Sequence, residues 1–292
     1  MSHLRFITKE LINKGWSNDI KYCVTSEDGM KYLLRITPNG KIADCEAMFK
    51  LLQQVAALSI PMCRPVEYGT CNEGTYIVLT WVFGKDAEKV IPYLNEEEQH
   101  AYGFEAGKIL KLIHTIPAPE NQPEWEVLFN DKMNRKIRIY NECPIKFEGS
   151  KDIIEYIESN RHLLANRPQC YQHGDYHIGN FMIEEHQIVI IDFDRYDFGD
   201  PWEEFNRIVW CAQSSPVFAS GIVNGYFDNE VPIEFWKLLA LYISSNTLSS
   251  IPWAIPYGNQ EVTTMINQAK DVLSWYKNMK NPIPNWYVEG KS

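Results

Sequence analysis

Alternating and continuous apolar runs predict strands in the first eighty residues of the chain. Residues 19–25 and 31–36 are two such runs, and the turn residues 27–29 separate them. Runs of this length, rich in β-branched and aromatic residues and bounded by turn residues, are typical of a β-hairpin. A third run at residues 76–82 is almost continuously apolar and ends before Gly84, which indicates a buried strand.

Helical periodicity follows the first strands and dominates the rest of the chain. In residues 44–58 apolar side chains recur three or four positions apart, which predicts a helix buried along one side. Asn95 followed by three glutamates is a capping signal, and the apolar stripe after it predicts a helix as far as His114. Further amphipathic helices are expected at residues 152–166, 234–249 and 262–276.

The pattern changes from strands to helices near residues 83–85. A chain of 292 residues, 45% of them hydrophobic, can bury the core of two lobes or of one large domain. Residues 1–14 lack the charged-then-apolar layout of a signal peptide, and no apolar run reaches membrane-spanning length. We therefore expect a cytoplasmic protein without a membrane partner.

Charge and cysteine content narrow the expected partners. The formal net charge of −10 argues against a nucleic acid, because phosphate binding requires a basic face. The same charge suits a cationic substrate, although many cytosolic proteins are equally acidic. Seven cysteines, an odd number without a C-x-x-C pair, are expected to be buried reduced thiols.

A central stretch of the chain contains the candidate chemistry. Two short apolar runs, residues 181–183 and 188–191, are joined by four polar residues and predict a hairpin. Because a hairpin brings its open ends together, Asn180 at its start and Asp192 at its end should face one spot. Asp175, in the loop before the first strand, is expected at the same place.

Two oxygen ligands and one free carboxylate form the set that phosphoryl transfer requires. Mg²⁺ prefers carboxylate, amide and phosphate oxygens, so Asn180 and Asp192 would hold the metal. Asp175 would orient an acceptor hydroxyl and take its proton, as the Asp does in a catalytic loop H-x-D-x-x-x-x-N. His173 and the residues up to Asn180 have this spacing. Asp and Asn in loops also serve as caps and turns, so each residue taken alone has a structural alternative.

His173 and His177 allow a second interpretation. With Asp175 they form His-x-Asp-x-His, which offers nitrogen and oxygen ligands to Zn²⁺. The chain has seven histidines and no second cluster of them, which argues against a zinc site. We expect both rings to form hydrogen bonds that orient the loop.

Three motifs together resemble the aminoglycoside phosphotransferase and choline kinase group of protein-kinase-like enzymes. They are HGDYHIGN at residues 173–180, IDF at 191–193 and GDP at 199–201, and both their order and their spacing match. The resemblance implies Asp175 as catalytic base, with Asn180 and Asp192 as Mg²⁺ ligands and ATP or GTP as phosphoryl donor.

The same resemblance implies an α+β fold of two lobes. Residues 1–83 would form a small nucleotide-binding lobe around an antiparallel sheet. Residues 84–292 would form a larger, mostly helical lobe that contains the catalytic loop and the acceptor site.

On the nucleotide side, the turn-rich residues 13–18 stand where the resembled family has its phosphate-covering loop. Gly15 and the small Ser17 would allow the phosphates to approach, although a plain surface turn has the same sequence. The family lysine on the strand after this loop is replaced by Arg35, which keeps the charge but not the shape of a lysine. Lys31, on the same face of that strand, is the alternative phosphate ligand.

Two further contacts are expected in this lobe. Glu46, on the next helix, would pair with Arg35, although a glutamate in a first turn also complements the helix dipole. The backbone of Thr80, Trp81 and Val82 would meet the nucleotide base at the hinge. A plain core or edge strand would have the same sequence as these three residues.

Acidic and aromatic residues after the third motif are candidates for acceptor binding. Their carboxylates would bind ammonium groups, and the ring would stack on a sugar or hold a cation. The alternative is a solvated acidic rim. The candidates are Asp194, Asp197, Trp202, Glu203 and Glu204.

The third motif also predicts a helix start. Asp200 as N-cap, Pro201 at the first helical position and Glu203 three residues after the cap form a capping box, which would open a helix to about Cys211. Asp200 is therefore expected to be structural, and the family resemblance implies that its carboxylate also braces the catalytic loop.

These observations predict a small-molecule kinase that acts as a monomer. An aminoglycoside-like polyamine is the leading acceptor, and choline, an amino alcohol or a sugar are the alternatives. Arg35 and the glycine-poor loop also allow a different class, a nucleotide-binding pseudoenzyme or regulatory scaffold. The intact set of Asp175, Asn180 and Asp192 argues against that class.

Overall fold

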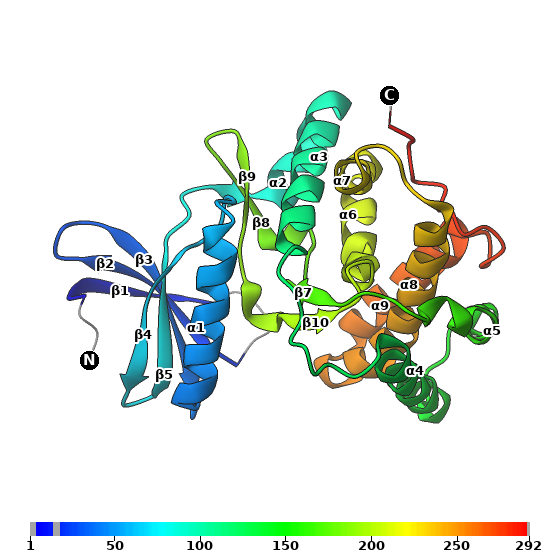
Figure 1. The fold of residues 1–292 in the computed structure, drawn as a ribbon, viewed down its shortest axis with the longest axis horizontal. Coiled ribbons are helices and arrows are strands. Elements are labelled where there is room, and N and C mark those ends of the chain that lie inside the picture. The colour runs from blue at the N-terminus through cyan, green and yellow to red at the C-terminus, as the bar shows by residue number, and fades with distance from the viewer. Residues whose placement is uncertain (1–3, 14–17, 291–292) are drawn as a thin grey trace. The chain divides into compact units, whose positions relative to one another are not determined.

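The computed structural model describes residues 4–13 and 18–290, so the predictions for Gly15 and Ser17 lie outside the described residues. By their internal contacts these residues form two compact units. As far as they are described, unit 1 takes in Met1–Ala87 and Asn180–Asp194, and unit 2 takes in Glu88–Gly179 and Arg195–Ser292. Figure 1 labels the helices and strands of both.

Unit 1 is built on a five-stranded antiparallel sheet in the order β1-β2-β3-β5-β4. Its strands are β1 (Phe6–Ile12), β2 (Ile20–Ser26), β3 (Lys31–Pro38), β4 (Pro65–Cys71) and β5 (Gly74–Thr80). Alternate residues of three of these strands share one face, as a pleated strand requires, and form the core of the sheet. They are Val24, Leu34, Ile36, Tyr76 and Val78.

Helix α1 (Ile42–Ala57) joins β3 to β4 and packs against β4, where the Phe49 ring lies 4.8 Å from the Tyr68 ring. The predicted hairpin of β2 and β3, the helix α1 and the strand β5 are confirmed. β1 was not predicted, because most of its side chains are exposed and its sequence contains no continuous apolar run.

A second, three-stranded sheet completes unit 1. The predicted hairpin forms as β8 (Phe181–Glu184) and β9 (Gln187–Ile190), and β8 pairs with β6 (Lys85–Asp86). The Ile190 N–H donates to the Pro61 carbonyl at 3.0 Å, which ties the hairpin to the segment before β4. The expected limits at residues 83 and 84 assigned this hairpin to the second lobe. These backbone hydrogen bonds instead group it with the first unit.

Unit 2 is mostly helical. Its helices are α2 (Ala87–Val90, which begins in unit 1), α3 (Glu96–Ile113), α4 (Trp125–Glu142), α5 (Ser150–Asn160), α6 (Ile208–Ser214), α7 (Pro216–Phe227), α8 (Ile233–Ala254) and α9 (Asn259–Trp275). A short antiparallel pair, β7 (Cys170–Gln172) and β10 (Asp197–Gly199), lies in the same unit. Six short 3₁₀ segments occur at Ile91–Tyr93, Arg161–Leu164, Ile178–Asn180, Phe193–Arg195, Glu203–Arg207 and Ile255–Tyr257.

The expected start of α3 is confirmed by its capping box. The Asn95 side chain accepts from the Glu98 N–H at 2.9 Å, and the Glu98 carboxylate accepts from the Asn95 N–H at 3.3 Å. Two helices had no clear sequence signal. α4 is polar apart from a narrow buried stripe, and α7 is apolar on nearly every side, so neither shows the broad one-sided pattern that predicts a surface helix.

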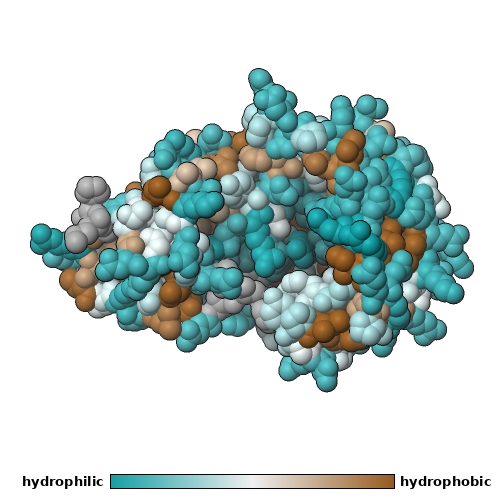
Figure 2. Space-filling model, turned by 90° about the horizontal axis from the view of Figure 1, so that it is seen from below, coloured by the Kyte–Doolittle hydropathy of each residue, from teal (hydrophilic) through white to brown (hydrophobic). Residues whose placement is uncertain are grey.

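None of the helices in the described parts of the chain has the length and apolar content that a membrane span needs. The face in Figure 2 is largely hydrophilic, with hydrophobic side chains in small separate groups. Six cysteines are buried free thiols as expected, but Cys71 is exposed because it lies at the end of the edge strand β4.

Glycines set the contact between α3 and α7, which lie side by side in Figure 1. A Cβ atom on Gly103 would collide with the Phe218 carbonyl oxygen, and one on Gly107 would collide with that of Ile222. In the other direction, a Cβ on Gly225 would meet the Phe104 carbonyl oxygen. The two backbones therefore touch at a distance that only glycine permits.

We expect Gly107→Ala to destabilise the protein by about 2–3 kcal/mol, because overpacking costs more than the helix propensity of alanine contributes. Urea unfolding at equilibrium measures the change. Glu97→Ala, at an exposed position of the same helix, should change stability by no more than about 0.5 kcal/mol. A Gly107→Ala protein as stable as the wild type would show that the helices can separate freely.

Candidate active site

The hairpin of unit 1 brings its two ends together as predicted. The Ile191 N–H donates to the Asn180 carbonyl at 3.0 Å, which places Asp192 beside Asn180. Asp192 has a φ of 66°, in the left-handed region that non-glycine residues rarely adopt. Such strained positions in proteins cluster at functional sites.

A buried ion-pair cluster surrounds Asp192. Arg35 on β3 contacts three carboxylates with its three guanidinium nitrogens. Its Nη1 lies 2.9 Å from Asp192 Oδ1, while its Nε bonds to Asp19 and its Nη2 to Asp194. Only 11% of the Arg35 side chain is exposed. The planar guanidinium of Arg35 therefore holds together three carboxylates that would otherwise repel one another.

Burial opposes the charge of Arg35, but its hydrogen bond to Asp194 and the charges of Asp194, Asp192 and Asp19 outweigh burial and raise the pKa of the guanidinium. Asp192 and Asp194 shift in opposite directions. Burial again opposes the charge on Asp192, yet its hydrogen bond to Asp194 and the nearby cations lower the pKa of Asp192. Burial and the same hydrogen bond raise the pKa of Asp194. Asp192 is thus the carboxylate that stays ionised and suited to a cation.

Lys21 on β2 is a second cation at this place and was missed by the sequence analysis. It lies directly across from Arg35 in the β2–β3 ladder, and its Nζ is 3.2 Å from Asp192 Oδ2. Lys31, the predicted alternative, is exposed at the start of β3. The position of Lys21 in the predicted hairpin could have identified it, because cross-strand partners share a face of the sheet and Lys21 is the partner of Arg35.

Glu46 does not pair with Arg35. Its carboxylate lies 2.7 Å from Lys50 Nζ, one turn along α1, and the two side chains are 42% and 65% exposed. Arg35 is already satisfied by three aspartates. The predicted contact is therefore replaced by a surface pair of the i,i+4 type, which contributes little to stability.

Of the predicted hinge residues, Thr80 is the last residue of β5 and Trp81 and Val82 follow it; all three are half-buried. The Thr80 N–H donates to the Arg64 carbonyl at 2.9 Å, and its hydroxyl accepts from the Arg64 N–H at 2.8 Å. Thr80 is thus held by the segment before β4. Trp81 and Val82 begin the irregular stretch that leads to β6.

In unit 2 the catalytic-loop motif begins where β7 ends. Gly174 has a φ of 82°, and a Cβ there would collide with the Arg195 carbonyl oxygen. Its N–H donates to both carboxylate oxygens of Glu204, at 3.0 and 3.1 Å. Glu204 is 2% exposed, so a buried charge fixes the turn that carries Asp175.

The Asp175 carboxylate has two basic neighbours in unit 2, a histidine and an arginine. Its Oδ1 lies 3.5 Å from His177 Nε2 and 3.4 Å from Arg207 Nε. Burial opposes the charge, but His177, Arg207 and Arg195 outweigh it and hold the pKa of Asp175 below its usual range. The carboxylate is therefore ionised at neutral pH, as a proton acceptor must be.

The two histidines of this motif orient the loop, as expected. His173 is fully buried and its Nδ1 accepts from the Asp175 N–H at 3.3 Å. The His177 Nδ1 accepts from the Gly179 N–H at 3.1 Å. In the described parts of the chain no three His, Cys, Asp or Glu side chains are grouped so that they could hold a metal.

Most of the predicted acceptor-binding residues have other partners. Asp194 bonds to Arg35, and Glu204 bonds to the Gly174 N–H. Glu203 is 8% exposed and lies 3.3 Å from Lys132 Nζ, with Gln172 Nε2 also at 3.3 Å. These three acids are thus used within the fold. Asp197 is exposed, and its carboxylate accepts from the Phe198 N–H at 2.8 Å.

Trp202 is packed rather than presented to solvent. Its ring lies edge-on to Phe227 and Phe235, at 5.8 and 5.7 Å, and the Arg167 guanidinium lies 3.9 Å from its centroid. The ring therefore already stacks on a cation of the protein itself.

Asp200 is structural as expected, but the capping box is not formed. Its fully buried carboxylate pairs with Arg167 Nε at 2.6 Å and accepts from the Tyr242 hydroxyl at 2.5 Å. It also accepts from the Trp202 N–H at 2.9 Å. A 3₁₀ turn over Glu203–Arg207 follows, and α6 begins only at Ile208. Because Glu203 is taken by Lys132 and Gln172, it does not reach back to the cap.

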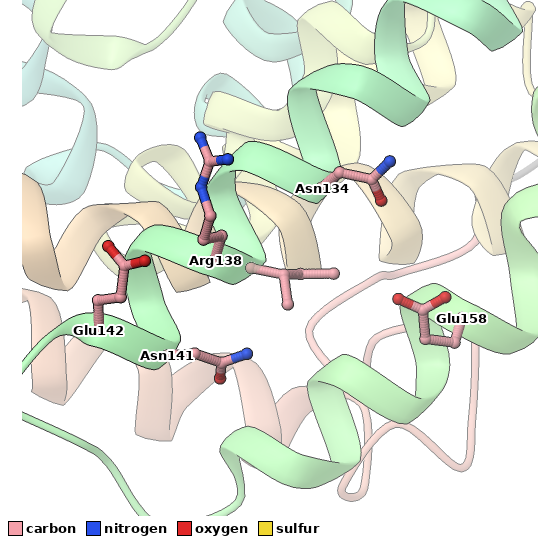
Figure 3. Close-up of a pocket in the computed structure, with 6 residues that line it drawn as sticks. Asn134, Arg138, Asn141, Glu142 and Glu158 are labelled. Carbon is pink, nitrogen blue, oxygen red and sulfur yellow. The ribbon is translucent and has the colours of Figure 1, made fainter.

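A separate pocket of about 290 Å³ lies between α4 and α5, with side chains from both helices around it (Figure 3). It is lined by Asn134, Ile137, Arg138, Asn141, Glu142 and Glu158. None of the predicted site residues lines it.

Arg207 and Asp19 were also missed by the sequence analysis. Arg207 lies four residues beyond Glu203, inside a stretch that was expected to be helical, and Asp19 stands at the start of a predicted strand. Neither lies within one of the three motifs. Only the folded chain brings Arg207 to Asp175 and Asp19 to Arg35.

Comparisons with known proteins agree with this geometry. The model of the phosphotransferase enzyme family matches residues 9–236. A search of curated protein sequences found no match. The family match confirms the predicted resemblance and the expected phosphotransferase class.

Solved structures show the same fold at low sequence identity. A thermostable mutant of an aminoglycoside phosphotransferase, in ternary complex with ADP and hygromycin B, is 13% identical, with a TM-score of 0.66 over 92% of this chain and 94% of that one. Amicoumacin kinase in complex with AMP-PNP, Ca²⁺ and its ligand is 13% identical, with a TM-score of 0.66 over 94% and 90%. A choline/ethanolamine kinase family protein from Mesorhizobium loti is 15% identical, with a TM-score of 0.67 over 94% and 92%. The expected α+β kinase-like fold is confirmed.

Replacing Arg35 should make stability depend on pH in a predictable direction. The pKa of Asp192 is lowered in the folded state, so its contribution is present above the unfolded pKa of about 3.9 and is lost as pH falls. In Arg35→Met the acids lose their common cation. We expect a loss of about 3–5 kcal/mol at pH 7, which narrows toward pH 4 as the uncompensated carboxylates take up protons.

Urea unfolding at pH 7, 5.5 and 4 measures this difference, with Lys31→Met as a control that removes an exposed cation of the same strand. A deficit for Arg35→Met that is equal at all three pH values would contradict the proposed electrostatic cause.

Proposed function

We propose that this chain, which belongs to the phosphotransferase enzyme family, transfers the γ-phosphoryl group of ATP or GTP to a hydroxyl group of a small molecule. The observation that carries the proposal is the family match together with the placement of three residues inside the matched range. Asp175 is an ionised carboxylate on a braced turn, and Asn180 and Asp192 are neighbours at one end of the hairpin.

Asp175 is the catalytic base in this proposal. Its carboxylate orients the acceptor hydroxyl and takes its proton. The acceptor oxygen forms a bond to the γ-phosphorus, and the bond from that phosphorus to the oxygen bridging to the β-phosphate breaks. The departing nucleoside diphosphate keeps the electron pair. Positioning and charge neutralisation therefore supply most of the catalysis, as they do in other phosphoryl transfers.

Asn180 and Asp192 fit a Mg²⁺ ion by the chemistry of their donors. An amide oxygen and an ionised carboxylate are hard oxygen ligands, and Mg²⁺ is usually bound by one or two carboxylates together with substrate phosphates. Asp192 is 30% exposed, so its oxygens are accessible from solvent. When bound, Mg²⁺ would neutralise charge on the phosphate oxygens.

Arg35 and Lys21 are the cations we assign to the nucleotide phosphates. Both already contact Asp192, through different oxygens of its carboxylate. A triphosphate would give these cations anionic oxygens of its own, and it would free Asp192 for the metal. In the same proposal Gly15 and Ser17 cover the phosphates, and the backbone of Thr80, Trp81 and Val82 meets the base.

The acceptor is a hydroxyl compound of low molecular mass. The structural neighbours include aminoglycoside phosphotransferases, an amicoumacin kinase and a choline/ethanolamine kinase family protein. On the family resemblance, an aminoglycoside-like polyamine is the leading candidate acceptor, and choline, an amino alcohol or a sugar are the alternatives. A pseudoenzyme that binds nucleotide without transfer is the competing class.

Release of ADP or GDP by the purified protein tests the proposal across a panel of aminoglycosides, amino alcohols, sugars and hydroxy acids. We expect one acceptor class to stimulate release, and we expect Asp175→Asn to lower kcat about 10²–10⁴-fold without weakening Mg-nucleotide binding. Asp228→Asn, at an exposed aspartate of unit 2, should leave kcat unchanged. Turnover by Asp175→Asn at the wild-type rate would sink the assignment.

Asp192→Ala should remove the metal dependence of nucleotide binding. In the wild type, Mg²⁺ should tighten ATP or GTP binding about tenfold or more, and in Asp192→Ala the affinity should be equal with Mg²⁺ and with EDTA. Isothermal titration calorimetry measures both. Asp44→Ala, at an exposed position of α1, should keep the wild-type dependence. A metal effect preserved in Asp192→Ala would show that the ligand lies elsewhere.

A further inference from the structure

Cations gather beside the catalytic base of unit 2, although the chain as a whole carries a net charge of −10. Arg207 lies 3.4 Å from Asp175 Oδ1. Lys132 and Lys136 stand one turn apart on α4 and so share a face of that helix. Lys136 interacts electrostatically with Lys132, Arg207 and Arg135, which links the α4 lysines to the arginine that touches Asp175.

Two carboxylates face this group of cations, Asp175 at Arg207 and Glu203 at the lysines. Glu203 interacts with Lys136, lies 3.3 Å from Lys132 Nζ, and also accepts from Gln172 Nε2. Burial, followed by the charge of Lys132, lowers the pKa of Lys136 to about 7, and Glu203 offsets only part of this effect. Arg207 Nε is buried and has no hydrogen-bond partner among the described residues. Three basic side chains thus lie beside two carboxylates, and the Lys132 and Arg207 side chains remain 34% and 28% exposed.

Three of the four acids that were predicted to bind a polycationic acceptor are already used by the protein. Glu203, Glu204 and Asp194 are all engaged within the fold, as described above. Arg207 and Arg195 also hold the pKa of Asp175 low, which weakens it as a base. An anion bound by Arg207 would partly neutralise that arginine and strengthen the base.

We propose that Lys132, Lys136 and Arg207 bind an anionic group of the acceptor, a carboxylate or a phosphate, and so present its hydroxyl to Asp175. The inference rests on the proposed function and names the acceptor class: a small hydroxyl compound with a negative charge, in place of an aminoglycoside-like polyamine. The anionic oxygens would accept hydrogen bonds from the two ammonium groups and from the Arg207 guanidinium, whose Nε makes no hydrogen bond shorter than its 3.4 Å contact with Asp175.

The test compares acceptors that share a scaffold and differ in charge. On a six-carbon scaffold these are gluconate, glucose 6-phosphate, glucose and glucosamine. On a three-carbon scaffold they are glycerate, glycerol 3-phosphate, glycerol and 3-amino-1,2-propanediol. Nucleoside diphosphate release is measured for each, beside kanamycin and choline. We expect the anionic members to stimulate release, and the carboxylate and phosphate arms separate the two sources of charge.

Variants of Lys136 test whether the preference for anionic acceptors depends on Lys132, Lys136 and Arg207. Lys136→Gln should raise the KM of the anionic acceptor about tenfold while kcat and the KM of the nucleotide stay the same, and Lys136→Arg should restore most of the affinity. Lys270→Gln removes an exposed lysine of α9 and should change neither constant. Efficient turnover of kanamycin, choline or a neutral sugar, with Lys136→Gln unaffected, would overturn the inference and leave the proposed kinase function standing.

A second measurement does not depend on turnover. Acetylation of Lys136 by acetic anhydride is followed by mass spectrometry, with Lys270 as internal reference. Gluconate or glucose 6-phosphate should slow the modification of Lys136 but not of Lys270, and glucosamine should not. Equal labelling of Lys136 in every compound would overturn the inference. Absence of Mg-nucleotide binding would instead contradict the proposed kinase function. The protection of Lys136 from acetylation would still report whether the anion binds, because that measurement needs no nucleotide.

Discussion

The site in unit 1 depends on one buried guanidinium. Arg35 gathers Asp19, Asp192 and Asp194 at a place where less than a third of any of these side chains is exposed. Without the cation, three acids in a poorly solvated site would repel one another or take up protons. With it, Asp192 stays ionised at the end of β9 in a left-handed conformation, next to Asn180. The charge state of the predicted metal ligand is thus set by a residue on a different strand.

A similar logic holds in unit 2, where buried acids fix backbone turns. Glu204 receives the Gly174 N–H with both oxygens, and Asp200 is held by Arg167 and Tyr242. Glu204 lies within thirty residues of Asp175 in the sequence and was predicted as an acceptor ligand, whereas Asp200 was expected to be structural. In the fold Glu204 holds the turn that carries Asp175, and Asp200 holds the start of the segment that leads to Glu204.

The sequence predicted what is local. The hairpin that carries Asn180 and Asp192 and the capping box at Asn95 follow from short-range patterns, because strand alternation and caps are decided within a few residues. It could not predict pairings that depend on the packing of distant elements. Glu46 was assigned to Arg35 by the resemblance, yet three aspartates occupy that arginine, and the cross-strand neighbour Lys21 had no motif to mark it. Helix α4 was missed because it is polar apart from a narrow buried stripe, and α7 was missed because it is apolar on nearly every side.

The glycine contact between α3 and α7 has an evolutionary consequence. Because each missing Cβ faces a backbone carbonyl of the other helix, no change of a neighbouring side chain can make room for a larger residue. Sequence drift at Gly103, Gly107, Gly221 and Gly225 is therefore tied to the spacing of the two helices and not to the identity of single partners. A distant relative that carries larger residues at these positions must hold its helices farther apart. The distance between α3 and α7 can thus be inferred from the residues at these four positions of a sequence.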